Sequence, residues 1–130
     1  MRKIDANILL RYLLNDHADF SPKAKNIIDN NIVEIPIEAL CEVVFVLHGF
    51  YNTPRMEVSQ NLIDFFTKTK TILPSRDAVL KGIEYFGQTN LDFVDCILAG
   101  YYEINREPVD TFDKDLQKLL DKVNERNNQP

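Results

Sequence analysis

The chain has 130 residues, of which 45% are hydrophobic and 27% charged, and its net charge is −5 at neutral pH. This length suits one domain with its own core, and the composition excludes a low-complexity or disordered chain. No apolar stretch approaches the roughly 20 residues of a membrane span, and Asp5 and Asn7 interrupt the N-terminal run that a signal peptide needs, so we expect a cytoplasmic protein.

The first part of the chain predicts two short strands and three helices. A very short strand ends at Asp5, and a helix with apolar residues along one side follows it. Ser21, followed by proline, has the form of an N-cap and predicts the start of a second helix. A short apolar strand then ends at Pro36, which opens a helix that is expected to stop near Gly49.

Three further helix starts can be recognised by their capping residues. Thr53, followed by proline, repeats the start signal of Ser21. Ser75 precedes a helix with regularly spaced apolar residues, and Asp92 precedes a strongly apolar one. We therefore expect helices after each of these positions.

Two brief strands and a closing helix complete the predicted elements. The strands are expected at residues 68–74 and 108–112, and the helix follows Asp113. Short strands that alternate with helices predict an α/β fold with a small parallel sheet. We expect one domain over residues 1–123, followed by a polar and disordered tail over residues 124–130.

Four acidic residues lie at the edges of apolar runs in four separate segments: Asp5, Glu42, Asp95 and Asp113. A carboxylate at the rim of a buried element is costly unless something compensates it. Ligands of parallel α/β folds collect at the carboxyl ends of the strands, where two of these acids are expected. The pattern predicts a pocket for Mg²⁺ or Mn²⁺ and metal-assisted cleavage of a phosphodiester, with RNA as the favoured substrate.

Four stretches of the chain resemble the PIN-domain ribonucleases, specifically the VapC-type toxins of toxin–antitoxin pairs. The resemblance runs from Ile4 to about Leu120. The stretches that carry it are IDANILLRYLL, ALCEVVFVL, LDFVDCILAGY and DTFDKDLQKL. It implies a PIN-like α/β/α sandwich and a nuclease that uses Mg²⁺ or Mn²⁺ to cut RNA, often tRNA or another structured RNA. It also implies a small antitoxin protein that blocks the site.

The resemblance assigns roles to six positions of this sequence. The acids of the family fall on Asp5, Glu42, Asp95 and Asp113, and its polar and hydroxyl positions fall on Asn7 and Thr111. Asp110 and Asp115 flank the last acid, so the fourth ligand is either Asp113 or one of these neighbours.

Each acid also has a purely structural interpretation. Asp5 and Asp113 could cap the helices that follow them, and Asp95 could favour a helix dipole. Glu42 could be solvated, but its apolar neighbours leave little solvent face. Glu38, one turn earlier, is an auxiliary candidate for which a surface role is expected.

Arg11 has two open interpretations. It follows the first turn of a helix, where it could reach an RNA phosphate or neutralise the four acids. A structural ion pair is an equally good account of it.

Two other functions compete with the nuclease. One is a PIN-like module that binds RNA or protein without cutting, although such a module has no reason to keep a repulsive cluster of acids. The other is a phosphatase or phosphoacceptor of the haloacid dehalogenase or receiver type, and it fits poorly because Asp5-Ala6-Asn7 lacks the second aspartate of the phosphatase motif.

The net charge and two apolar helix faces indicate which RNA and protein partners to expect. A net charge of −5 argues against strong non-specific RNA binding, although bound cations would neutralise the acids and the fifteen Lys and Arg could line a groove. Two apolar helix faces could be core or could bind a partner or a second copy, so a homodimer is expected; their residues are Leu47, Phe50, Tyr51, Leu62, Phe65 and Phe66.

Overall fold

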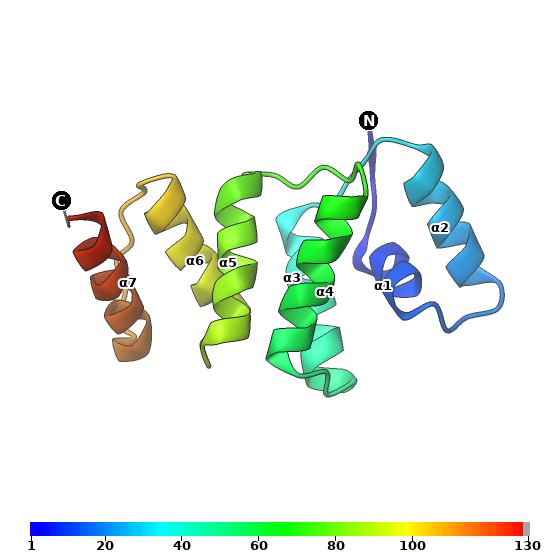
Figure 1. The fold of residues 1–130 in the computed structure, drawn as a ribbon. Helices are drawn as coiled ribbons and strands as arrows, with labels where there is room; N and C mark the ends of the chain where they lie inside the picture. Colours follow the sequence, from blue (N-terminus) through cyan, green and yellow to red (C-terminus); the bar gives the residue numbers. More distant parts are fainter. Residues whose placement is uncertain (129–130) are drawn as a thin grey trace. The chain divides into compact units, whose positions relative to one another are not determined.

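The computed structural model describes residues 1–128 and divides into two compact units, a first unit of Met1–Pro74 and a second unit that begins at Ser75 (Figure 1). The first unit contains β1 (Arg2–Lys3), α1 (Ala6–Leu14), α2 (Phe20–Asn30), β2 (Val33–Glu34), α3 (Ile37–Phe45), η1 (Val46–Phe50) and α4 (Arg55–Lys68). The second unit contains α5 (Arg76–Gln88), α6 (Phe93–Ile104) and α7 (Lys114–Asn127).

A small parallel sheet organises the first unit. β1 pairs with β2, with Lys3 opposite Glu34. A single parallel bridge joins Glu34 to Ile72, whose backbone N–H donates to the carbonyl oxygen of Val33 at 2.7 Å. The predicted strand over 68–74 is therefore reduced to one bridged residue. The prediction of an α/β fold with a small parallel sheet is confirmed, although helices dominate the described residues.

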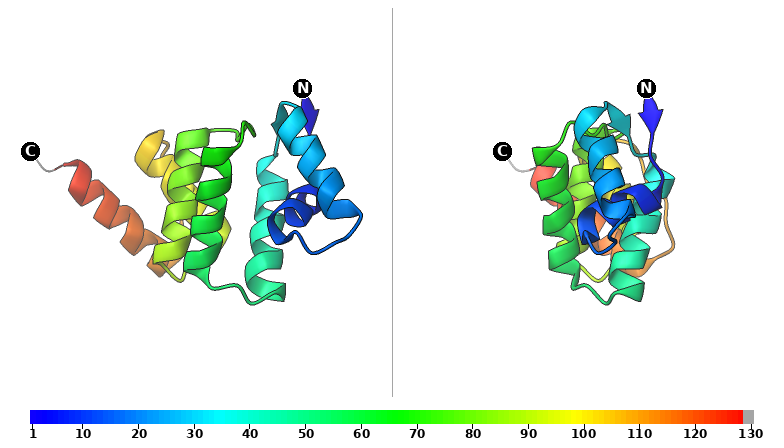
Figure 2. Two further views of the ribbon diagram at one scale, coloured as in Figure 1. Left: turned by 45° about the vertical axis from the view of Figure 1, so that its right-hand side comes forward. Right: turned by 90° about the vertical axis from the view of Figure 1, so that its right-hand side faces the viewer.

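The helices of the first unit follow most of the expected signals. Asp5 precedes α1 and Pro36 precedes α3, as the sequence predicts, whereas Pro54 occupies the N-cap position of α4 that was predicted for Thr53. Figure 2 shows α1 and α2 packed beside each other in this unit. Their apolar sides form its core with side chains of α3 and α4 and with Ile35, which follows β2; the largest fully buried ones are Leu9, Ile35, Leu40, Leu62 and Phe66.

The start of α2 differs from the prediction. The helix begins at Phe20, and Ser21 lies inside it with its Oγ accepting the backbone N–H of His17 at 3.1 Å. The capping group is the ring of His17, because its Nδ1 accepts the backbone N–H of Phe20 at 2.9 Å and that of Asp19 at 3.2 Å. The prediction of Ser21 as N-cap is therefore wrong.

The second unit consists of helices in its described part. α5 and α6 pack closely at two glycines: a Cβ at Gly100 would collide with the carbonyl oxygen of Ala78, and one at Gly82 would lie 2.9 Å from that of Cys96. Side chains cannot be added at these positions without separating the helices. The contact holds the N-terminal end of α6 in a defined position, and this end carries Asp95.

Two predictions for the end of the chain are wrong. Residues 108–112 form no strand, because the described part of the second unit offers no strand to pair with them and Pro108 has no backbone N–H to donate. α7 continues to Asn127, so residues 124–127 are helical and not a tail. Residues 129 and 130 lie outside the described residues, and the single domain over 1–123 stays a prediction.

Candidate functional site

Asp5 lies two residues after the end of β1 and caps α1. Its Oδ1 accepts the backbone N–H of Ile8 at 3.0 Å, so the structural interpretation of this residue is confirmed. A cap of this kind satisfies one free N–H of the helix and engages one of the two carboxylate oxygens. Because the side chain is exposed, Oδ2 can bind a second group.

Glu42 lies on α3 and borders the same surface depression as Asp5. The depression has a volume of about 390 Å³, is open to solvent, and is also bordered by Lys3 and Glu38. Glu42 is exposed, so the expectation that it has little solvent face is wrong: Val43 and Val44 take the buried face of the helix. The first unit thus places two of the four predicted acids, and the auxiliary Glu38, around one depression.

Lys3 adds a cation at the edge of this depression. Its Nζ forms an ion pair with Glu34 of β2, across the sheet. Its charge is therefore already matched by an acid that does not border the depression.

The two auxiliary residues of α1 have different surroundings. Asn7 is exposed on the first turn of the helix. The Nη1 of Arg11 forms an ion pair with Oδ1 of Asp16 at 2.9 Å, so the ion-pair interpretation of this residue is confirmed. The buried Nε of Arg11 has no hydrogen-bond partner among residues 1–128.

The charges of two carboxylates act on a third one, Asp95, in the second unit. Asp95 lies in the first turn of α6 and is partly buried. Burial raises the pKa of Asp95, and the negative charges of Asp113 and Asp92 raise it further. Such a group of like charges is costly without a compensating cation and is typical of functional sites.

Asp113 caps α7 in the way that Asp5 caps α1. Its Oδ1 accepts the backbone N–H of Leu116 at 2.8 Å, and its own backbone N–H donates to Oγ1 of Thr111 at 3.0 Å. Thr111 therefore fixes the backbone that presents Asp113. This gives Thr111 a structural role, in addition to the one that the resemblance assigns to it.

The sequence predicted that Asp92 caps α6, but its side chain acts differently in the structure. It occupies the N-cap position of α6, but its side chain makes no capping hydrogen bond. Its charge instead acts on Asp95. The signal in the sequence was its spacing of three residues from Asp95, which brings both carboxylates to the first turn of one helix.

The donor atoms of the candidate acids are of a chemical type that binds hard divalent cations. All are carboxylate oxygens, which Mg²⁺ and Mn²⁺ prefer over nitrogen or sulfur. Within the part of the chain that the structure describes, no group of three or more His, Cys, Asp or Glu side chains is arranged to hold a metal ion. The structure thus presents suitable acids without a formed metal centre.

Comparison with known protein families decides which family this chain represents. The model of the PIN domain matches residues 3–122, which include parts of both units and all seven predicted site residues. The chain belongs to the PIN domain family. Its fold is accordingly the PIN fold, with helices and a small parallel sheet, as predicted.

Membership in this family supports a class of activity. PIN domains are generally nucleases, so hydrolysis of nucleic acid is the supported class of activity. No curated protein and no solved structure matches the chain. No helix among residues 1–128 has the length and apolar character that crossing a membrane requires.

Proposed function

We propose that this PIN domain is a metal-dependent endoribonuclease and the toxin of a toxin–antitoxin pair. The observation that carries the proposal is the position of Asp95, which is partly buried and close enough to Asp113 and Asp92 for their charges to raise its pKa. A purely structural acid at the start of α6 would need neither Asp113 nor Asp92 nearby. A catalytic cation would compensate these charges.

The proposed ligands of Mg²⁺ or Mn²⁺ are Asp5, Glu42, Asp95 and Asp113. Asp5 and Asp113 are suited to this task because each is held in place by a helix cap through Oδ1 and keeps Oδ2 for another group. Glu42 is exposed beside Asp5 and needs no rearrangement of the core to bind a ligand. Divalent cations held in this way stabilise charge on a phosphate and activate water.

RNA is the proposed substrate, with tRNA or another structured RNA as the class that toxin members cut. Asn7, on the first turn of α1, and Thr111, which positions Asp113, would assist the acids. Arg11 is assigned to the support of α1 through Asp16. The proposed toxin role would place the protein in the cytoplasm.

A protein partner is supported by apolar side chains on the surface of the first unit. Phe45, Phe50 and Met56 are 75%, 73% and 72% exposed, and Tyr51 packs edge-on against Phe50 with ring centroids 5.1 Å apart. Of the two faces identified in the sequence, Leu47, Leu62, Phe65 and Phe66 are core, whereas Phe50 and Tyr51 are not. An antitoxin or a second copy of the chain would cover such exposed apolar side chains.

One observation favours a non-catalytic binding module. Asp5 and Asp113 both cap helices, so the chain would keep them even without catalysis. A variant that preserves the cap but changes the charge separates the two functions. Asparagine caps helices about as well as aspartate, so Asp5→Asn is this variant.

Growth of bacteria after induction of the chain alone tests the toxin role. We expect the native protein to arrest growth and Asp5→Asn, at matched soluble expression, to permit it. Equal arrest by both proteins would show that the effect arises from binding and would contradict the proposal. The matched control is Asp64→Asn, which removes one carboxylate outside the proposed set and should still arrest growth.

A further inference from the structure

We propose that α7 carries a binding track for the phosphate backbone of single-stranded RNA, formed by Lys118, Lys122 and Arg126. These three residues are called the basic stripe below. The inference rests on the proposed ribonuclease function, because it supplies a way to hold the substrate of that same site. None of the seven candidate site residues is part of it.

A groove beside the basic stripe provides the binding surface. Two adjoining hollows of about 430 and 310 Å³ lie in the second unit and share Thr89, Leu119 and Lys122. One hollow extends to Arg126, and the other extends to Lys118. Together they follow one side of α7 and the end of α5.

The two lysines of the stripe are free to bind an anion. Both are exposed, and neither forms an ion pair with another residue of the described chain. Arg126 is more constrained, since its Nη2 donates to the Oη of Tyr85 at 2.7 Å and lies 3.4 Å from Oε1 of Glu103. Lys118 and Lys122 therefore carry the proposal.

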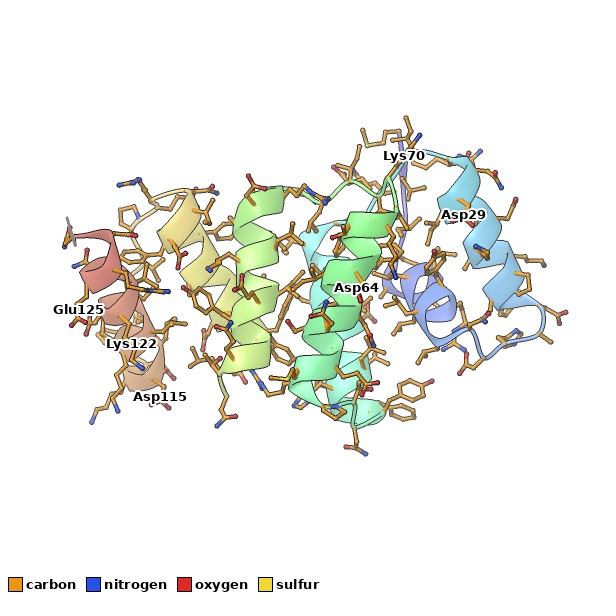
Figure 3. All side chains as sticks on the ribbon, viewed as in Figure 1. Asp29, Asp64, Lys70, Asp115, Lys122 and Glu125 are labelled. Carbon is orange, nitrogen blue, oxygen red and sulfur yellow. The ribbon has the colours of Figure 1, made fainter. Side chains whose placement is uncertain are left out.

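Acidic residues also border the groove and limit its strength. Asp115 and Glu125 line the two hollows, and Figure 3 shows them on α7 on either side of Lys122 along the helix. The groove thus has three cations against two anions. This balance agrees with weak binding that depends on salt, as the net charge of −5 predicts for the whole chain.

The spacing of the stripe suits a polymer of phosphates better than a single anion. Its members are four residues apart, which separates neighbouring cations by about 6 Å along the helix axis. A single anion would need converging donors, whereas a row of cations can follow a strand with one charge per nucleotide.

Uncharged groups of the groove complete the surface. Gln88 and Asn90 bring exposed hydrogen-bonding side chains to its other wall, whereas the hydroxyl of Thr89 already donates to the carbonyl oxygen of Tyr85 at 2.9 Å. Such groups commonly contact the phosphates and sugars of nucleic acids. Leu91 and Leu119 also line the groove, but each is only 8% exposed, so the binding surface is formed mainly by polar and charged side chains.

The stripe begins near one of the proposed metal ligands. Lys118 follows Asp113 by five residues, or about 8 Å along the axis of α7. A strand that lies along the stripe is thereby brought toward the end of the helix that carries Asp113. The stripe would position the substrate and take no part in the chemistry.

Fluorescence anisotropy with a labelled polyuridine strand of about 12 nucleotides tests the proposal. Binding is measured in EDTA, so that it does not depend on metal or on cleavage. The double variant Lys118→Gln and Lys122→Gln is compared with the native chain and with Lys23→Gln and Lys70→Gln, which makes the same change of net charge in the first unit. Thermal unfolding confirms that all three proteins fold.

We expect the stripe variant to bind roughly tenfold more weakly at low salt and the control to bind like the native chain. The slope of log K against log salt should fall by about 1.4, because each lost contact to a single strand removes about 0.7. If the stripe variant binds like the control, or if the native chain does not bind the strand, the proposal is overturned. Weaker binding by the stripe variant supports it even where Mn²⁺ induces no cleavage, and in that case only the proposed nuclease function fails.

Discussion

Asp113, the N-cap of α7, places a negative charge beside Asp95 in the first turn of α6. Burial raises the pKa of Asp95, and the charges of Asp113 and Asp92 raise it further. The surroundings of Asp95 in the folded second unit therefore disfavour its charged form. Neighbouring negative charges of this kind are expected where a cation binds during function.

The first prediction is that Asp95→Asn stabilises the protein at neutral pH in EDTA. Because folding raises the pKa of Asp95 above its usual value of 3.8, its contribution to stability is full below that pH and is lost as pH rises through the folded pKa. The gain in the midpoint of urea unfolding should therefore be present at pH 7 and shrink toward pH 3. Asp121→Asn, a change on the exposed face of α7, serves as the control. A lower stability of Asp95→Asn at pH 7 would contradict the prediction.

The second prediction separates the cap of Asp113 from its charge. Asp113→Ala should lower the free energy of unfolding by about 1 kcal/mol, because the backbone N–H of Leu116 loses its partner. Asp113→Asn keeps an acceptor oxygen and should lie within about 0.5 kcal/mol of the native value. Both should lose nuclease activity. Activity in Asp113→Asn would show that Asp113 is a cap alone.

The third prediction concerns divalent metal. If Mn²⁺ binds the folded chain, a concentration of about 100 times its dissociation constant stabilises the protein by about 2.7 kcal/mol. The shift in melting temperature should shrink in Asp5→Asn and in Asp95→Asn, whereas Asp64→Asn should keep it. An unchanged melting temperature of the native chain at saturating Mn²⁺ would contradict the metal site.

The fourth prediction concerns a cluster that links the three helices of the second unit. The Oη of Tyr85 in α5 donates to Oε1 of Glu103 in α6 and accepts from Arg126 in α7. Tyr85→Phe should lower the free energy of unfolding by about 1 to 2 kcal/mol, since hydrogen bonds to charged groups lie at the upper end of the usual range. Tyr51→Phe, at an exposed position, should change it little.

The same cluster has a predicted pH dependence. Burial and the hydrogen bond to Glu103 raise the pKa of Tyr85 to about 12. Since the folded pKa is higher than the unfolded one, the stability that Tyr85 contributes is full below pH 10 and is lost as pH rises toward 12. The difference in the free energy of unfolding between the native chain and Tyr85→Phe should therefore be full below pH 10 and fall as pH rises toward 12. A difference that disappears below pH 9 would contradict the assignment.

Local signals explain the parts of the fold that the sequence predicted. Asp5, Pro36 and Asp113 each act on the helix that follows them within one turn, so their effects do not depend on distant residues. The positions of two short strands were also predicted approximately, although β1 consists of Arg2 and Lys3 and ends two residues before Asp5. The four candidate acids were identifiable because they lie at the edges of apolar runs.

The errors arose where structure depends on a partner or on an unusual residue. Residues 108–112 have strand-like composition, but a strand forms only when another strand offers hydrogen bonds. His17 caps α2 with a ring nitrogen, which the usual preference for Ser21 concealed. The exposure of Glu42 depends on which side of α3 faces the core, and the apolar runs around it did not define that side.

Cleavage of labelled RNA under single-turnover conditions tests the central claim most directly. The native chain should cut RNA with Mn²⁺ and not with EDTA, and Asp5→Asn and Asp95→Asn should each reduce the rate by about 100-fold or more, because ligand loss costs at least as much as loss of a supporting residue. Asp64→Asn should cut at the native rate. Cleavage that persists in EDTA, or that survives both substitutions, would contradict a metal-dependent site built from these acids.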